Sequence, residues 1–548
     1  MKCNKTRRVL LFMSLLCATV SVAQTPFTSS NLPVIVIDTH GSAIVDDPKI
    51  SADMGIIDNG PGVRNNLTDA HNNFDGKIGI EIRGSSSQMF PKKQYGIEVQ
   101  DSTGAGIDAS LLGMPKKDDW VLFAPYNDKS LMRDALAYKL GRDQGRYASR
   151  SRYCEVVING VYMGVYVLLE KVKRDKNRVN IDKLEPTEIS GDALTGGYLI
   201  KIDKPVGYGG EGWFSAFAPP GRLYSQLIYF LYDTPKQDDI ADEQRAYIKD
   251  YVNAFENALA GDNFKDPAEG YAKYIDVDSF IDFFIMSEIT KNVDAYRIST
   301  YLYKKKDSDG GKLYMGPIWD FNLGFGNVDY CTLGNPEGFV IYFNIICPDD
   351  YWLIPFWWNR LLEDDAFRAK LTARWTALRE DKFKTTTILN YVDSVATVLN
   401  VESQQRNFAV WPVLGQHIWP NYYVGNTYQE EVTWLKNWIT QRVAWLDENI
   451  PMVITGIQER TRGFSFQAYP NPFTQEIQLE YELNTSGVLH IDLFDILGRR
   501  IEHLEKNHDQ LGKHQVNFST SGWPAGSYIV KARFGNRVVN EKVVKKPE

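Results

Sequence analysis

The sequence predicts an α+β fold with a strand-rich N-terminal half, a helix-rich C-terminal half and a small all-β sandwich at the end of the chain. Three observations support this prediction. Apolar and polar residues alternate through most of the first half, as in half-buried strands, and repeat with a helical period in the second half. After position 450, short alternating segments return between turn residues. Because strands and helices are segregated along the chain, an α+β fold is favoured over a doubly wound parallel sheet.

The first 23 residues have the composition of a signal peptide. The basic residues Lys2, Lys5, Arg7 and Arg8 precede the apolar run VLLFMSLLCATVSVA, which ends in small residues at Ala23. This run is shorter than the roughly 20 residues that cross a bilayer, and no later stretch qualifies. We therefore expect cleavage after Ala23, export, and no transmembrane segment in the mature chain.

The composition limits the classes of partner. The 548 residues are 43% hydrophobic and carry a net charge of −8, so we expect two or three domains and no nucleic-acid partner. Three cysteines follow the signal peptide, namely Cys154, Cys331 and Cys347. Their odd number leaves at least one free thiol. A Cys331–Cys347 bridge and three unpaired cysteines both agree with the spacing, and no zinc-site spacing occurs.

Strand patterns follow one another through the first half of the chain. PVIVIDT, KIGIEIRG and KQYGIEV alternate between Pro33 and Asp101. The pair Asn159-Gly160 separates SRYCEVVI from VYMGVYVLLE and predicts a two-residue hairpin. GGYLIKID and SQLIYFLY then predict a second sheet.

Helical periodicity begins at DEQRAYIKDYVNAFENAL and VDSFIDFFIMSEITKN. A hairpin from Asn292 to Asn322 interrupts it, with Asp294 before the first strand and Asp320 after the second. Helices are predicted again from WLIPFWWNRLLED to EEVTWLKNWITQRVAWLDEN. The aromatic residues of WLIPFWWNRLL recur at helical spacing, which indicates a buried core rather than a sugar-binding platform.

The loop in EIRGSSSQMFPKKQYGIEV has the residue types that bind phosphate. Small residues let backbone N–H groups approach an anion, and a lysine on the next strand neutralises it. Lys93 shares a strand face with Ile97 and Val99, so it is predicted to point inward while Lys92 points outward. The small residues of this loop are Gly84, Ser85, Ser86 and Ser87. A solvated serine turn is the alternative interpretation.

Three acidic residues could complete such a site. Glu170 ends an apolar strand and is either a partner for Lys93 or a solvent-exposed strand end. Asp294 and Ser299 have the spacing of the kinase catalytic loop, in which the aspartate orients the attacking hydroxyl. Asp320 follows the hairpin in WDFN, as the metal-holding aspartate of kinases does.

Together these segments resemble the spore coat protein CotH family. The resemblance rests on Arg83 to Tyr95, LLGMPKKDDWVLFAPYNDKSLMRDALAY, NGVYMGVYVLLEKV, NVDAYRISTYLY and MGPIWDFNLGFGN, in this order. It covers roughly Ile35 to Asn449. Members of this family resemble atypical, secreted protein kinases that use ATP and Mg²⁺ to phosphorylate proteins.

The resemblance implies an atypical protein-kinase-like core in residues 33–450 that uses ATP with Mg²⁺ or Mn²⁺. It assigns roles to the following residues: ATP binding to Arg83, Ser85, Ser86, Ser87, Lys93 and Glu170, catalysis to Asp294, and metal binding to Asp320, Asn322 and Ser299. Two positions depart from the family. Ser299 replaces an asparagine and Asn322 replaces a second aspartate, and both changes weaken the metal-ligand character of the site.

The end of the chain carries a second resemblance. YPNPF, LFDILGRRI and AGSYIVK are similar, in order, to the C-terminal sorting domain of the type IX secretion system of Bacteroidetes. The resemblance assigns residues 466–548 to this domain and implies delivery by the outer-membrane secretion machinery to the cell surface or the medium.

We therefore expect an exported kinase that transfers the γ-phosphate of ATP to Ser or Thr hydroxyls of a surface or secreted protein. The alternative is a catalytically weak or inactive CotH-like surface protein that binds a protein or glycan ligand. A glycoside hydrolase with paired carboxylates is a third hypothesis, but the separation of the two carboxylates must be read from a structure.

Overall fold

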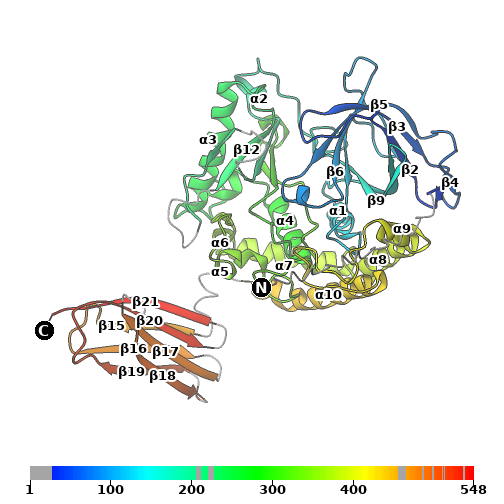
Figure 1. Cartoon of the computed structure of the whole chain (residues 1–548). Helices are drawn as coiled ribbons and strands as arrows, with labels where there is room; N and C mark the ends of the chain where they lie inside the picture. The colour runs from blue at the N-terminus through cyan, green and yellow to red at the C-terminus, as the bar shows by residue number, and fades with distance from the viewer. Residues whose placement is uncertain are drawn as a thin grey trace, which may run out of the picture.

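The structure is a computed structural model that describes residues 27–204, 211–219, 228–453, 464–483, 487–495, 499–508, 510, 512–534 and 537–547. The predicted signal peptide, residues 1–23, lies outside these ranges. The mixed α+β composition is confirmed, with a strand-rich N-terminal half, helices in the C-terminal half and all-β sheets at the C-terminus (Figure 1).

Seven strands of the N-terminal half close into a barrel in the order β2-β3-β5-β6-β7-β9-β8 (Figure 1, blue to cyan). They are β2 (Val34–Asp38), β3 (Ile50–Ile57), β5 (Phe74–Arg83), β6 (Gln94–Gln100), β7 (Asp119–Phe123), β8 (Ser151–Ile158) and β9 (Val161–Glu170). The parallel pair β2–β8 completes the closure. Alternate side chains such as Ile80, Ile97, Trp120 and Leu168 fill the interior. Closure leaves no exposed strand edge, which the strand patterns alone did not predict.

The predicted hairpin at Asn159-Gly160 is confirmed. Ile158 of β8 pairs with Val161 of β9, and the two turn residues have φ angles of 50° and 78°. Positive φ at both central positions is what a two-residue turn of this type requires, and asparagine and glycine adopt it most readily. Two short strands, β1 (Ser29–Ser30) and β4 (Asn65–Asn66), pair beside the barrel.

A second, five-stranded sheet has the order β11-β12-β10-β13-β14. Its strands are β11 (Gly212–Phe214), β12 (Tyr229–Thr234), β10 (Tyr198–Ile202), β13 (Thr300–Lys304) and β14 (Leu313–Met315). The antiparallel pairing of β13 with β14 confirms the predicted hairpin between Asp294 and Asp320. Ile202 pairs with Thr300, so the end of β10 lies beside the start of β13.

The helices pack below and beside the sheets (Figure 1). They are α1 (Arg133–Asp143), α2 (Gly191–Leu194), α3 (Asp242–Ala260), α4 (Val277–Thr290), α5 (Phe343–Ile346), α6 (Trp357–Leu361), α7 (Asp365–Glu380), α8 (Thr385–Asn400), α9 (Ser403–Val410) and α10 (Tyr428–Asn449). Within the described part of the chain, no helix has both the length and the apolar character needed to span a membrane.

The helix predicted over 352–364 is shorter than expected, because Pro355 precedes α6 and Asp364 begins a new helix. The Asp364 side chain accepts a hydrogen bond from the Ala366 N–H and so caps α7. The prediction that the aromatic residues of this segment are core is confirmed, since Trp357 and Trp358 are both fully buried.

The C-terminal strands form two antiparallel sheets around a core of their own (Figure 1, orange to red). They are β15 (Phe464–Tyr469), β16 (Glu476–Leu483), β17 (Gly487–Asp495), β18 (Arg500–His508), β19 (Gly512–Ser519), β20 (Gly526–Phe534) and β21 (Arg537–Lys545). Alternate residues such as Ile477, Leu479, Ile491 and Val530 face the core, as the period of two in the sequence predicts.

Candidate functional site

One end of the second sheet gathers three aspartates. Asp203 follows β10, and Asp294 lies in the turn between α4 and β13. Asp320 follows β14. Because β10 and β14 both run antiparallel to β13, their C-terminal ends and the start of β13 share the same end of the sheet. Residues separated by more than 100 positions are therefore placed together.

Charge interactions among these carboxylates shift their pKa values. Burial, followed by the charge of Asp294, raises the pKa of Asp320 to about 6, and the Arg83 guanidinium opposes that rise. Burial also raises the pKa of Asp294, against the charges of Arg297 and Lys204. Asp203 adds repulsion to both carboxylates. The site thus combines clustered carboxylates with neighbouring cations, a combination typical of functional sites.

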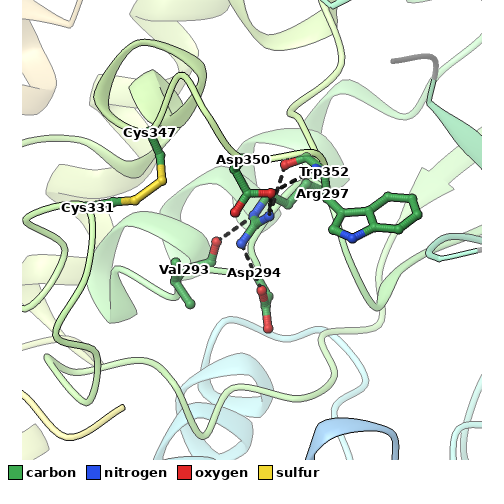
Figure 2. The surroundings of a disulfide bond; sticks show 7 residues. All are labelled: Val293, Asp294, Arg297, Cys331, Cys347, Asp350 and Trp352. Carbon is green, nitrogen blue, oxygen red and sulfur yellow. Dashed lines mark hydrogen bonds and ion pairs between the residues drawn. A yellow bond between two sulfur atoms is a disulfide. The ribbon is translucent and has the colours of Figure 1, made fainter. Parts of the chain in front are cut away.

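Arg297 holds the Asp294 carboxylate in place (Figure 2). Its Nη2 donates to Asp294 Oδ1 at 3.1 Å and its Nε to the Val293 carbonyl at 2.8 Å. Its Nη1 donates to Asp350 Oδ1 at 3.1 Å and to the Trp352 carbonyl at 2.9 Å. Only 2% of the Arg297 side chain is exposed. A buried guanidinium with this many partners fixes the geometry of the carboxylate that it contacts.

Helix α1 of the N-terminal half holds the loop at Asp320. The backbone N–H of Asp320 donates to the Tyr138 hydroxyl at 3.2 Å, and that of Phe321 donates to Asp134 Oδ1 at 2.7 Å. Burial and then the charge of Asp320 raise the pKa of Asp134 well above its usual value. Arg83, at the end of β5, stacks over Trp319 with a distance of 5.4 Å from its Cζ to the ring centroid. The barrel, α1 and the second sheet all contribute to the site.

The backbone of the site adopts uncommon conformations. Tyr296, Ser299 and Asp320 have φ angles of 71°, 49° and 63°, in the left-handed region. Such angles in residues other than glycine are found most often at functional sites, where surrounding contacts hold them.

Lys92 and Lys93 have the opposite orientations to those predicted. Lys92 is only 1% exposed and donates to the Val165 carbonyl at 2.6 Å and to Asn407 Oδ1 at 2.8 Å. Lys93 is half-buried, and its Nζ donates to the Gln88 carbonyl at 2.5 Å. The prediction extended the strand alternation backward, but β6 begins only at Gln94, after the turn that contains Pro91.

Glu170 is buried but does not pair with Lys93. Its carboxylate accepts hydrogen bonds from the Arg150 backbone N–H at 3.0 Å and from Arg150 Nη1 at 2.9 Å, and Arg178 Nε lies 3.8 Å away. Neither a Lys93–Glu170 ion pair nor a contact of either residue with Asp294 or Asp320 occurs among the ion pairs and hydrogen bonds of the described residues. The alternative of a solvent-exposed strand end is also wrong, since Glu170 is fully buried.

The remaining predicted residues lie on the surface or at the edge of the site. Ser85 and Ser86 are exposed and Ser87 is half-buried, and the turn at 86–89 forms a 3₁₀ helix between β5 and β6. Ser299 and Asn322 are half-buried. The Asn322 carbonyl accepts a hydrogen bond from Asn327 Nδ2 at 3.0 Å. The predicted roles of these five residues stay predictions.

The donor chemistry fits a hard divalent cation. Asp320, Asn322 and Ser299 offer oxygen atoms, which Mg²⁺ prefers, and the repulsion between Asp294 and Asp320 is the kind of charge excess that a cation offsets. Among the described residues, the groups of three Asp, Glu, His or Cys ligand atoms within 4.8 Å of one another do not include Asp203, Asp294 or Asp320.

Asp320→Asn should stabilise the ligand-free protein at neutral pH. The raised pKa means that the folded state binds more protons than the unfolded state between about pH 4 and pH 6, so stability falls as pH rises through that window. Asparagine removes the buried charge, and with it the repulsion by Asp294, and it tolerates the positive φ. We expect a gain of about 1–3 kcal/mol at pH 7 and none near pH 4, measured by denaturant unfolding. The control is Asp329→Asn at an exposed position. An equal gain in its free energy of unfolding would contradict the explanation from the raised pKa of Asp320.

Four residues of the site were not singled out from the sequence, namely Asp134, Asp203, Lys204 and Arg297. Asp203 is the last residue of the predicted strand segment GGYLIKID and Lys204 follows it, and polar residues at strand ends are a general signal for a site. Arg297 lies three residues after Asp294, but nothing in the pattern distinguishes it from a surface arginine. Asp134 carries no local signal.

Two family models match the chain. A family model described as CotH kinase protein matches residues 80–446, more than half of the chain, and a model described as secretion system C-terminal sorting domain matches residues 467–546. No curated protein matches the chain. Among solved structures, an endo-beta-1,4-mannanase from Thermotoga petrophila matches 24% of this chain and 26% of its own, at 14% identity and a TM-score of 0.12. That match spans about a quarter of the mannanase and carries no argument about fold or function.

Proposed function

The chain belongs to the CotH kinase protein family, and from this premise we propose that it transfers the γ-phosphate of ATP to Ser or Thr hydroxyls of a surface or secreted protein. The observation that carries the proposal is the convergence of Asp294 and Asp320 with Arg83 at one end of the second sheet. The sorting domain indicates the type IX secretion machinery as a partner and the cell surface or the medium as the destination.

In the proposed reaction, Asp294 acts on the acceptor. The acceptor oxygen attacks the γ-phosphorus, the bond from this phosphorus to the ADP oxygen breaks, and Asp294 orients the hydroxyl and accepts its proton. Arg297 donates a hydrogen bond to the Asp294 carboxylate and so restricts its orientation. Arg83 and Lys204, whose charges oppose the rise in the pKa of Asp320, stabilise the phosphate oxygens.

Asp320, with Asn322 and Ser299, would hold Mg²⁺ or Mn²⁺. Bound there, the ion would neutralise charge on the phosphates. The structure does not place Lys93 in position for the ATP-binding role that the resemblance implies. Because its Nζ donates to the Gln88 carbonyl, it would have to change partner to contact a nucleotide.

The second candidate function is a catalytically weak or inactive surface protein that binds a protein or glycan ligand. Two observations favour it. Arg150, and not Lys93, pairs with Glu170, so the ion pair that the resemblance implies is not made. In addition, Ser299 and Asn322 replace stronger metal ligands of the family.

Calorimetry on the mature chain, residues 24–548, with ATP and Mg²⁺ or Mn²⁺ separates the two candidates. The kinase proposal expects metal-dependent binding, and transfer of labelled γ-phosphate to a generic protein acceptor. The double variant Ser299→Asn/Asn322→Asp should bind Mg²⁺–ATP about tenfold more tightly or better. If neither the wild type nor the double variant binds nucleotide while both are folded, the result favours the surface protein that binds a protein or glycan ligand.

Deletion of residues 464–548 should prevent surface delivery in the native host. The deleted strands have a core of their own, so the remaining chain should stay folded and accumulate in the periplasm. Cell fractionation with an antibody to the N-terminal half measures this. Delivery to the surface at the normal level would contradict the role of the tail.

A further inference from the structure

Arg297 connects two loops that approach each other only in the folded chain (Figure 2). Its guanidinium lies between the carboxylates of Asp294 and Asp350 and donates to both at 3.1 Å. It also lies over the ring of Phe343, with its Cζ 4.0 Å from the ring centroid. The position of Asp294 therefore depends on the segment that carries Phe343 and Asp350.

A disulfide bond between Cys331 and Cys347 fastens that segment, which resolves the alternative that the sequence left open (Figure 2). Phe343 lies between the two cysteines in the sequence, and the backbone N–H of Cys347 donates a hydrogen bond to the Phe343 carbonyl at 2.7 Å. Asp350 follows three residues later, and its N–H donates to the Cys347 carbonyl at 3.2 Å. Its Oδ1 also accepts the Trp352 N–H at 2.8 Å.

The first cysteine is in the segment that leads away from Asp320. Cys331 comes eleven residues after Asp320 in the sequence. The disulfide therefore links the segment that follows the predicted metal ligand to the segment with Asp350, which accepts a hydrogen bond from Arg297. The cross-linked segment thus reaches Asp294 through Asp350 and Arg297. The other described cysteine, Cys154, is a buried free thiol in the barrel.

We propose that Arg297 is a positioning residue for Asp294 and that the Cys331–Cys347 disulfide secures it through Asp350. This inference rests on the proposed function. It adds that oxidation of Cys331 and Cys347 to a disulfide controls the position of Asp294 in the same site. The bond forms when two thiols lose two electrons and two protons to a disulfide oxidant, which is itself reduced to two thiols. An exported chain reaches an oxidising compartment, so the site would acquire its final geometry there.

Two measurements on the full mature chain test the inference. In the first, amide hydrogen exchange is compared between the oxidised protein and the same protein reduced by dithiothreitol, both in a Cys154→Ser background that removes the other thiol. The double variant Cys331→Ser/Cys347→Ser is measured alongside. We expect exchange over residues 291–300 to accelerate about fivefold or more in both disulfide-free forms, with β5 unchanged. Equal exchange in all forms would overturn the inference.

The second measurement separates positioning from a purely structural role. Arg297→Lys keeps a cation between the two carboxylates, whereas Arg297→Met removes it. We expect the transfer rate to fall by about tenfold or more in Arg297→Met and to recover partly in Arg297→Lys, with nucleotide affinity unchanged in both. A rate within about twofold of wild type in folded Arg297→Met would overturn the role of Arg297.

The two failures are distinguishable. If wild-type protein transfers no phosphate while exchange over 291–300 still depends on the disulfide, the proposed function fails and the connection from the disulfide to Asp294 stands. If transfer occurs at the same rate with and without the disulfide and exchange is unchanged, the proposed function stands and this inference fails.

Discussion

Asp320→Asn should abolish metal-dependent nucleotide binding while leaving the protein folded. A divalent ion is the largest charge in such a site, and without a carboxylate to hold it the phosphates of the nucleotide face Asp294 and Asp203 uncompensated. We expect affinity for Mg²⁺–ATP to fall by about 100-fold or more, measured by calorimetry at pH 7.5.

The same substitution is expected to raise stability, so lost binding cannot be attributed to unfolding. The control is Asp329→Asn, which changes an exposed aspartate nine positions later and should bind nucleotide like the wild type. Metal-dependent binding of wild-type strength by Asp320→Asn would show that another residue holds the ion. Asp203 would then be the first candidate.

Asp294→Asn should leave nucleotide binding intact and reduce phosphate transfer by about 10²–10⁴-fold. The amide keeps the shape of the side chain and can still accept the Arg297 N–H, but it cannot take the proton of the acceptor hydroxyl. The measurement is a single-turnover assay with labelled ATP, so that chemistry is separated from product release.

A matching loss of nucleotide affinity in Asp294→Asn would contradict this division of roles. It would mean that Asp294 acts on the nucleotide or the ion rather than on the acceptor. Asp329→Asn again serves as the control, since it removes one aspartate charge outside the cluster without touching the site.

Local patterns were sufficient for much of the architecture. The Asn159-Gly160 turn and the hairpin between Asp294 and Asp320 follow from short-range rules, because turn geometry depends on a few adjacent residues. The same holds for the alternating strands of the sorting domain and for the buried Trp357 and Trp358. Three of the ten site residues assigned from the sequence, Arg83, Asp294 and Asp320, are brought together at the centre of the site.

Predictions that depended on the exact residue at which a strand or helix begins were less accurate. Extending the alternation of β6 back by two residues exchanged the orientations of Lys92 and Lys93, because a shift of one position moves a side chain to the opposite face. A proline and a helix-capping aspartate likewise divided the helix predicted over 352–364 into α6 and α7.

The sequence by itself determined the order of strands and helices, the family, the sorting tail and the two aspartates of the hairpin, since each of these is written in contiguous residues. Only the tertiary structure decided which charged side chains lie next to one another. Glu170 pairs with Arg150 rather than Lys93, Asp203 joins Asp294 and Asp320, and Arg297 reaches Asp350. An ion pair depends on the distance between side chains that the fold brings together from separate elements, and no local period encodes that distance. Closure of the barrel and formation of the Cys331–Cys347 bond are decided at the same level, because both join segments through space.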